Sequence, residues 1–170
     1  MRPSPGVLMK FLFALILFVV FTFTAVFTVN AQSAETIWLQ AGTTDYKTGE
    51  TVTATINANT ATPIQGFTAQ IRYDPSCLQP INATSSISGM NGLVLPQTPG
   101  LVDASFASST PQIINGVLAE VHFTALKGCQ TILSLETAAL AVRNETGFAV
   151  PLAGVSIGNK AIILNIDSAV

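Results

Sequence analysis

The stretch FTAQIRYDP, residues 67–75, decides the fold predicted for this chain. Its odd-numbered positions from 67 to 73 are apolar or aromatic, and its even-numbered positions over the same span are polar. A period of two is typical of a β-strand that buries one face, so we expect a strand here. The side chains expected to face outward from this strand are Thr68, Gln70 and Arg72.

Asp74 and Pro75 are expected to end this strand. Proline has no N–H to donate to a β-ladder, and an aspartate side chain often caps its own turn. Short β-rich runs separated by turn residues continue on both sides of it. They cover residues 36–40, 51–58, 77–81, 93–95, 101–107, 116–126, 131–135, 138–142 and 160–166. Eight or nine short strands, with no clear helix of three turns, predict an all-β sandwich.

Four segments carry more detailed expectations. Residues 42–50 are read as a loop, and residues 137–142 also fit a single helical turn. The sequence NETG, residues 144–147, is expected to form a hairpin turn. In the run 116–126 the bulky apolar positions change parity once, which predicts a bulge near Ala119 and Glu120.

The first 31 residues have the pattern of an export signal. A basic start without acidic residues leads into an apolar run over residues 11–29, and a small residue, Ala31, follows at the cleavage position. We therefore expect a signal peptide that is cut between Ala31 and Gln32. The apolar run is also long enough to cross a bilayer, so an uncleaved N-terminal anchor is the alternative.

Cleavage would leave a single domain, residues 32–170, of 170 − 31 = 139 residues. Two of the seven basic residues, Arg2 and Lys10, would be lost, so five remain against nine acidic residues, a net charge of −4. A domain of this size buries enough surface to be stable alone. Because no basic stripe is present, we expect no nucleic-acid partner, and no membrane association once the signal is removed.

The chain contains two cysteines, Cys77 and Cys129. Export would place both in an oxidising compartment, where an even number of cysteines predicts a disulfide. The alternative is a pair of buried free thiols. Two distant cysteines and one histidine are too few ligands for a metal site of the zinc type.

The mature sequence has no arrangement typical of catalysis. His122, the only histidine, lies in a predicted strand and is expected to point to solvent, and no nucleophile-elbow motif accompanies it. The acidic residues are scattered without a spacing that pairs two carboxyls. We therefore expect a non-catalytic binding protein with no catalytic residue, no metal and no cofactor.

Aromatic residues bear on carbohydrate binding, which usually needs exposed rings on one face. Only Tyr46 and Phe148 lie in predicted loops, and Trp38, between two large apolar residues, is expected to be at least partly in the core. The residues themselves therefore do not favour direct binding of sugars.

The order of several motifs resembles that of the cohesin domain family. The resemblance covers about residues 36–166, and its most specific part is Tyr-Asp-Pro after an alternating strand. The matching segments, in order, are KTGETV (47–52), PIQGF (63–67), YDP (73–75), GVLA (116–119) and ILSL (132–135).

This resemblance implies a nine-stranded jelly-roll β-sandwich, immunoglobulin-like in architecture, that docks a helical dockerin partner on one flat sheet face. It places the contact on the strand before Tyr-Asp-Pro, where Thr68, Gln70 and Arg72 face outward. The best-known members carry an Asn and an Asp at the positions matching Gly66 and Thr68.

We therefore expect a secreted or cell-surface module that binds a dockerin-type protein in the setting of polysaccharide breakdown. Two alternatives remain open at this point. One is a carbohydrate-binding module of the same architecture, with a polysaccharide as its partner. The other is a structural or adhesive surface module that only displays its sheet.

Overall fold

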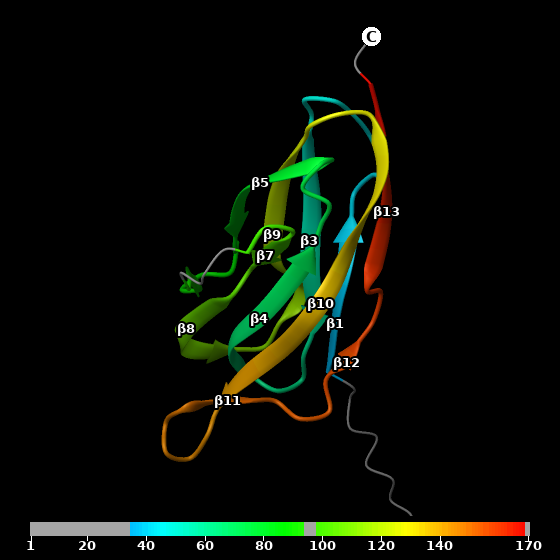
Figure 1. Cartoon of the computed structure of the whole chain (residues 1–170). Coiled ribbons are helices and arrows are strands. Elements are labelled where there is room, and N and C mark those ends of the chain that lie inside the picture. The colour runs from blue at the N-terminus through cyan, green and yellow to red at the C-terminus, as the bar shows by residue number, and fades with distance from the viewer. Residues whose placement is uncertain (1–34, 94–97, 169–170) are drawn as a thin grey trace, which may run out of the picture. The chain divides into compact units, whose positions relative to one another are not determined.

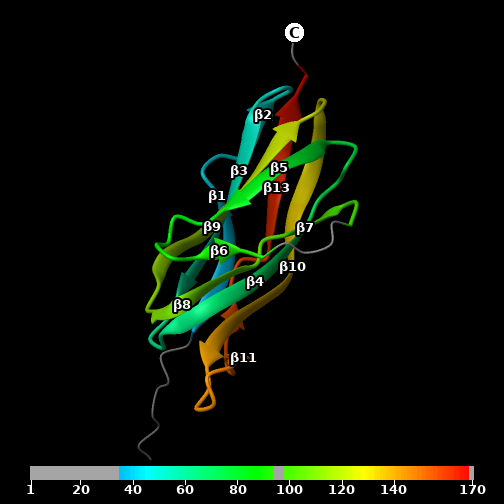
Figure 2. The same cartoon turned by 90° about the vertical axis from the view of Figure 1, so that its left-hand side faces the viewer.

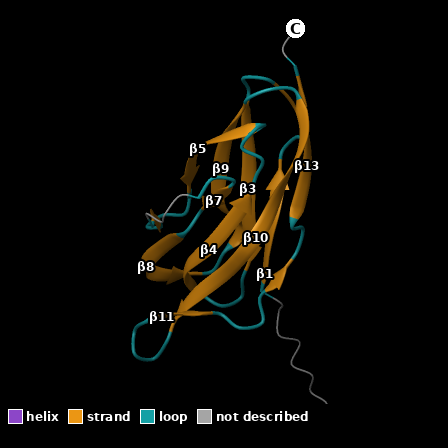
Figure 3. Ribbon diagram, viewed as in Figure 1, coloured by secondary structure: helices purple, strands orange, loops and turns teal. Residues whose placement is uncertain are grey.

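The computed structural model describes residues 35–93 and 98–168. These residues form two β-sheets packed face to face, without a helix among them (Figures 1 and 3). The all-β sandwich expected from the sequence is therefore confirmed. None of the elements in the described ranges is a helix long and apolar enough to cross a membrane.

The smaller sheet has five strands and the larger sheet has eight. The smaller sheet contains, in spatial order, β12 (Ser156–Ile157), β1 (Thr36–Ala41), β3 (Thr51–Asn59), β9 (Asn115–Ala125) and β5 (Leu78–Thr84). The larger sheet contains β2 (Asp45–Lys47), β13 (Ala161–Asp167), β10 (Cys129–Arg143), β4 (Ile64–Arg72), β8 (Phe106–Gln112) and β6 (Asn91–Gly92), with β11 (Ala149–Pro151) paired to β10 and β7 (Leu101–Asp103) paired to β4.

Strand β4 has the two faces that its sequence predicts. Phe67, Ala69 and Ile71 are almost completely buried between the sheets, whereas Thr68 and Arg72 are exposed on the other side. Alternation therefore sets which side chains are available to a partner.

The turn after β4 is held by Asp74, as expected. The Ser76 amide donates a hydrogen bond of 2.8 Å to Asp74 Oδ1, and this bond is the main reason why the pKa of the Asp74 carboxyl lies below its ordinary value. Asp74 therefore stabilises the turn that follows β4.

Strand β10 corrects two expectations. Residues 131–135 and 138–142, predicted as separate runs, belong to one strand, and the helical turn considered for 137–142 is not present. The interruption is a bulge at Glu136, where the register with β4 shifts between Leu135 and Thr137. Because of this extra residue, the side chains after the bulge alternate with the opposite parity from those before it. The alternation therefore looks broken in the sequence.

The hairpin between β10 and β11 forms at the predicted turn. The Gly147 amide donates to the Asn144 carbonyl at 3.0 Å, and Gly147 has a φ of 87°, a left-handed conformation that glycine adopts readily.

The bulge predicted near Ala119 and Glu120 is present in β9. The register with β3 shifts around Leu118, so that Leu118 and Ala119 are both fully buried.

The predicted loop 42–50 is wrong in its middle. Asp45–Lys47 forms β2, which pairs in parallel with the last strand, and Tyr46 is 91% buried rather than displayed in a loop. A three-residue strand stabilised by a segment about 120 residues away leaves no periodic pattern to detect. Short edge strands of this kind also explain why thirteen strands are present in the described residues, so the expected number of nine is not confirmed.

Cys77 and Cys129 form the disulfide expected from the sequence, with Cα atoms 6.3 Å apart. Cys77 immediately precedes β5 in the smaller sheet, and Cys129 begins β10 in the larger sheet. The bond therefore connects the two layers of the sandwich.

Some expectations fall outside the described residues. These are the signal segment, residues 1–31, with its cleavage site between Ala31 and Gln32, and residues 94–95 of the run 93–95.

Candidate partner-binding face

The outer face of the larger sheet displays all three residues predicted to contact a partner. In the pairing of β4 with β10, Thr68 lies opposite Ala139, Gln70 opposite Thr137, and Arg72 opposite Ser134. Figure 2 shows the two strands side by side. Alternation and register thus place Thr68, Gln70 and Arg72 in one row on an open surface.

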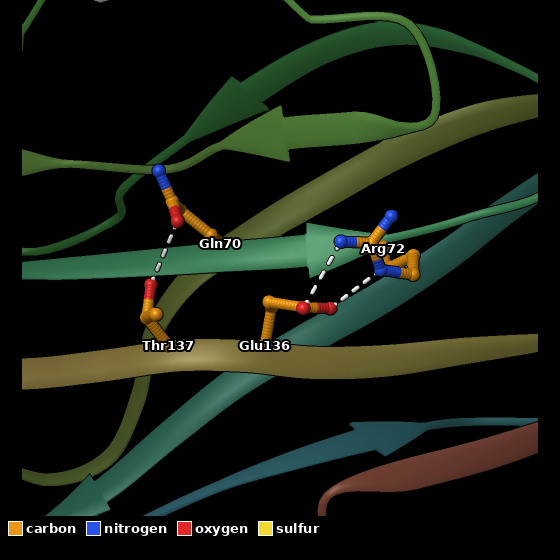
Figure 4. A network of polar contacts seen from close by, with 4 residues as sticks. All are labelled: Gln70, Arg72, Glu136 and Thr137. Atoms are coloured by element: carbon orange, nitrogen blue, oxygen red, sulfur yellow. Dashed lines mark hydrogen bonds and ion pairs between the residues drawn. The ribbon is translucent and has the colours of Figure 1, made fainter.

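Arg72 is held in place by Glu136. Its Nε and Nη2 atoms donate hydrogen bonds of 2.6 and 3.0 Å to the two carboxylate oxygens (Figure 4). These bonds lower the pKa of the Glu136 carboxyl below its ordinary value. Both side chains remain accessible, with 57% and 39% of their surfaces exposed, so solvent weakens their attraction and the pair serves mainly to orient Arg72.

Gln70 takes part in a second set of hydrogen bonds beside this ion pair. Thr137 Oγ1 donates to Gln70 Oε1 at 2.9 Å (Figure 4), and Gln70 Nε2 donates to Asp103 Oδ2 at 3.2 Å. Ser105 Oγ donates to the other oxygen of Asp103 at 2.5 Å. We call the set Gln70, Arg72, Asp103, Glu136 and Thr137 the polar band.

An apolar hollow lies at one end of the polar band. Its volume is about 330 Å³, and small outward-facing residues from three adjacent strands form its floor. Leu93 lines it near β6, and Ala149, Val150 and Pro151 line it from β11. The residues of the floor are Gly66, Ala107, Ala139 and Ala141.

Two exposed isoleucines lie toward the other end of the same face. Ile132 of β10 is directly opposite Ile163 of β13, and more than half of each side chain's surface is exposed. The outer face thus has a polar centre between two apolar areas, which suits a partner that is itself amphipathic.

Sequence reasoning missed the residues that surround the three predicted ones. Asp103 comes from β7, a three-residue strand, and Glu136 is the bulged residue of β10. Neither position follows from a simple alternating pattern. The only signal was the break in alternation after Leu135, which read as a strand end.

The outer face of the smaller sheet carries the remaining candidates. His122 is half-buried, its Nδ1 atom lies 3.1 Å from Thr53 Oγ1, and its Nε2 atom lies 3.6 Å from Glu120. Trp38 is half-buried on this face as well, since its neighbours Ile37 and Leu39 occupy the core. In the ranges that the structure describes, no group of three or more His, Cys, Asp or Glu residues could hold a metal ion.

Comparison with known families gives one match over most of the chain. The profile of the Cohesin domain family matches residues 37–150. No curated protein matches.

Solved structures similar to this chain include several cohesins. A cohesin module from a family 33 glycoside hydrolase of Clostridium perfringens has a TM-score of 0.64 at 15% identity, covering 80% of this chain and 98% of its own. A type II cohesin domain from the cellulosome of Acetivibrio cellulolyticus has a TM-score of 0.56 at 22% identity, covering 78% and 95%. A type II cohesin–X-dockerin complex from the same organism gives 0.55 at 19% identity, covering 78% and 99%. At these identities the likeness shows the fold.

Proposed function

Because this chain belongs to the cohesin domain family, we propose that it is an extracellular docking module for a dockerin-type protein partner. Cohesin domains are non-catalytic binding modules, and one of the similar structures is a cohesin in complex with an X-dockerin. We propose further that the chain works in polysaccharide breakdown, as part of an assembly or beside an enzyme. The outer face of the larger sheet is the surface that we assign to the partner.

The arrangement of that face is the observation that carries the proposal. Strands β4 and β10 are central in the sheet, and their outward side chains are uncovered in the described residues. Side chains there are polar at the centre and apolar toward both ends. Protein interfaces combine a few buried anchors with surrounding polar contacts, and this face offers both kinds.

Two positions should show the largest loss of binding when changed: Arg72 in the polar band and Thr68, which lines the apolar hollow beside it. We expect Arg72→Ala and Thr68→Asp each to lower the affinity for a purified partner several-fold or more, as measured by isothermal titration calorimetry. Arginine is among the commoner interface anchors, and a new carboxylate at position 68 would need a matching cation. Both residues are exposed, so the melting temperature should change little.

Glu136→Gln is the control for the Arg72 variant. It removes the carboxylate that orients Arg72 but keeps the guanidinium, so binding should fall less than in Arg72→Ala. The partner is obtained by capture from the host's secreted proteins on immobilised domain and is then purified. Parent-like affinity in both Arg72→Ala and Thr68→Asp would place the interface elsewhere.

Carbohydrate binding is the alternative, with a polysaccharide as the partner. The rings named for it from the sequence are poorly placed: Tyr46 is in the core and Trp38 is half-buried, while Phe148, 70% exposed, is at the hairpin tip. Stacking on a sugar chain needs several exposed rings in a row. Retention of the purified domain on insoluble cellulose, without any protein partner, would favour this alternative.

The proposed location depends on the N-terminal segment. We expect the exported protein to begin at Gln32, because a small residue at Ala31 stands before the cut and an apolar run precedes it. N-terminal sequencing of the protein recovered from the culture medium tests this. Recovery from the membrane fraction with Met1 intact would instead establish an anchor and surface retention.

A further inference from the structure

The apolar hollow is larger than a gap between neighbouring side chains. Its volume is about 330 Å³, whereas an apolar cavity of about 150 Å³ is already enough to bind benzene. The hollow therefore has room for one large aliphatic or aromatic side chain from outside the chain.

The sheet's own side chains leave the floor of the hollow open, and at position 66 packing requires this. A Cβ atom at position 66 would lie 2.7 Å from the carbonyl oxygen of Phe106, closer than real Cβ atoms come to a backbone atom, so only glycine fits. The three other floor residues are alanines, and the strands that carry them are paired by backbone hydrogen bonds. Among the residues that line the hollow, Gln65 and Thr68 have polar side chains and the rest are apolar or glycine, so a largely apolar group is the suitable occupant.

A positively charged side chain, that of Arg143, lies at the edge of this hollow. Arg143 is the next outward residue of β10 after Ala141. Its Nε donates to Gln65 Oε1 at 3.2 Å and its Nη2 to the Ser109 carbonyl at 3.5 Å. Within residues 35–93 and 98–168 it forms no ion pair, unlike Arg72, whose charge is matched by Glu136.

We propose that the partner seats one large apolar side chain in the hollow and places an Asp or Glu against Arg143. This inference rests on the proposed docking function and identifies the partner's anchor. Outward residues two apart on a strand are roughly 7 Å apart, and residues four apart on a helix are about 6 Å apart along its axis. On a docking helix the apolar anchor and the acid should therefore be three or four positions apart.

Selection from a helix library tests the chemistry without knowledge of the natural partner. One exposed helix of a monomeric three-helix scaffold is randomised, displayed on yeast and selected against the mature domain. We expect selected helices to carry a large apolar residue three or four positions from an Asp or Glu. Their affinity should fall about tenfold or more for Ala139→Phe, which fills the hollow from its floor.

Two further variants make the test specific. Ala153→Phe adds the same ring at an exposed turn residue that does not line the hollow, and it should bind like the parent. Arg143→Glu should lower the affinity of the selected helices about tenfold. Replacing the acidic residue of those helices by Lys should restore the affinity. This charge exchange needs no change in the hollow, so it remains informative even if Ala139→Phe folds poorly.

The outcomes distinguish the proposed anchor in the hollow from the proposed docking face. Selected helices that lose affinity for Arg72→Ala, which lies outside the hollow, but bind Ala139→Phe and Arg143→Glu like the parent, would overturn the anchor and leave the docking face in place. Failure to select any helix that binds the larger sheet would overturn both.

Discussion

Replacing Cys77 and Cys129 together by alanine is expected to lower the free energy of unfolding by about 4 kcal/mol. The bond joins residues 52 positions apart in sequence, and closing a loop of that length removes about 4 kcal/mol of chain entropy from the unfolded state. It also connects the start of β5 to the start of β10, one in each sheet. Without it, the edge strand β5 is held mainly by its pairing with β9.

Urea unfolding followed by tryptophan fluorescence and circular dichroism measures this difference. The oxidised parent, the reduced parent and the double alanine variant should be compared, because the reduced parent keeps both side chains and isolates the effect of the bond. We expect the reduced parent and the variant to be similarly destabilised. A difference below about 1 kcal/mol between oxidised and reduced parent would show that the crosslink contributes little.

The parts of the fold that could be predicted are those in which one chain segment determines its own pattern. Strand β4 shows period-two alternation because one of its faces packs on the other sheet, and that pattern is readable in FTAQIR. Strand β2 could not be found, because its pairing partner is β13, near the other end of the chain. Tyr46 is therefore buried by a tertiary contact that local sequence does not encode.

The candidate site divides in the same way. The outward direction of Thr68, Gln70 and Arg72 follows from alternation, and the structure confirms it. Their neighbours Asp103 and Glu136 depend on which strands pair with β4 and where β10 bulges. The hollow depends on register as well, since Gly66, Ala107 and Ala141 come together only across three strands.

Replacing Gly66 by asparagine is expected to destabilise the domain by about 3 kcal/mol. This change introduces the residue that the best-known cohesins carry at the matching position. In this chain a Cβ atom there would lie 2.7 Å from the Phe106 carbonyl oxygen and 3.3 Å from the Ala107 Cα. Both are backbone atoms of β8, so relief requires β4 and β8 to separate, and overpacking of this kind costs about 1–3 kcal/mol or more.

Thr68→Asp is the matched control, because it introduces the other residue of the same pair. Thr68 is exposed, and its substitution should change the free energy of unfolding by less than about 1 kcal/mol. Chemical denaturation of both variants makes the comparison. If Gly66→Asn unfolds like the parent, β8 yields easily and glycine at position 66 is not imposed by packing. If it is destabilised as expected while Thr68→Asp is not, the close approach of β8 excludes the polar anchor at position 66. Because the β8 backbone lies so close to Gly66, this position carries no side chain, and the floor of the hollow stays open for an apolar anchor from the partner.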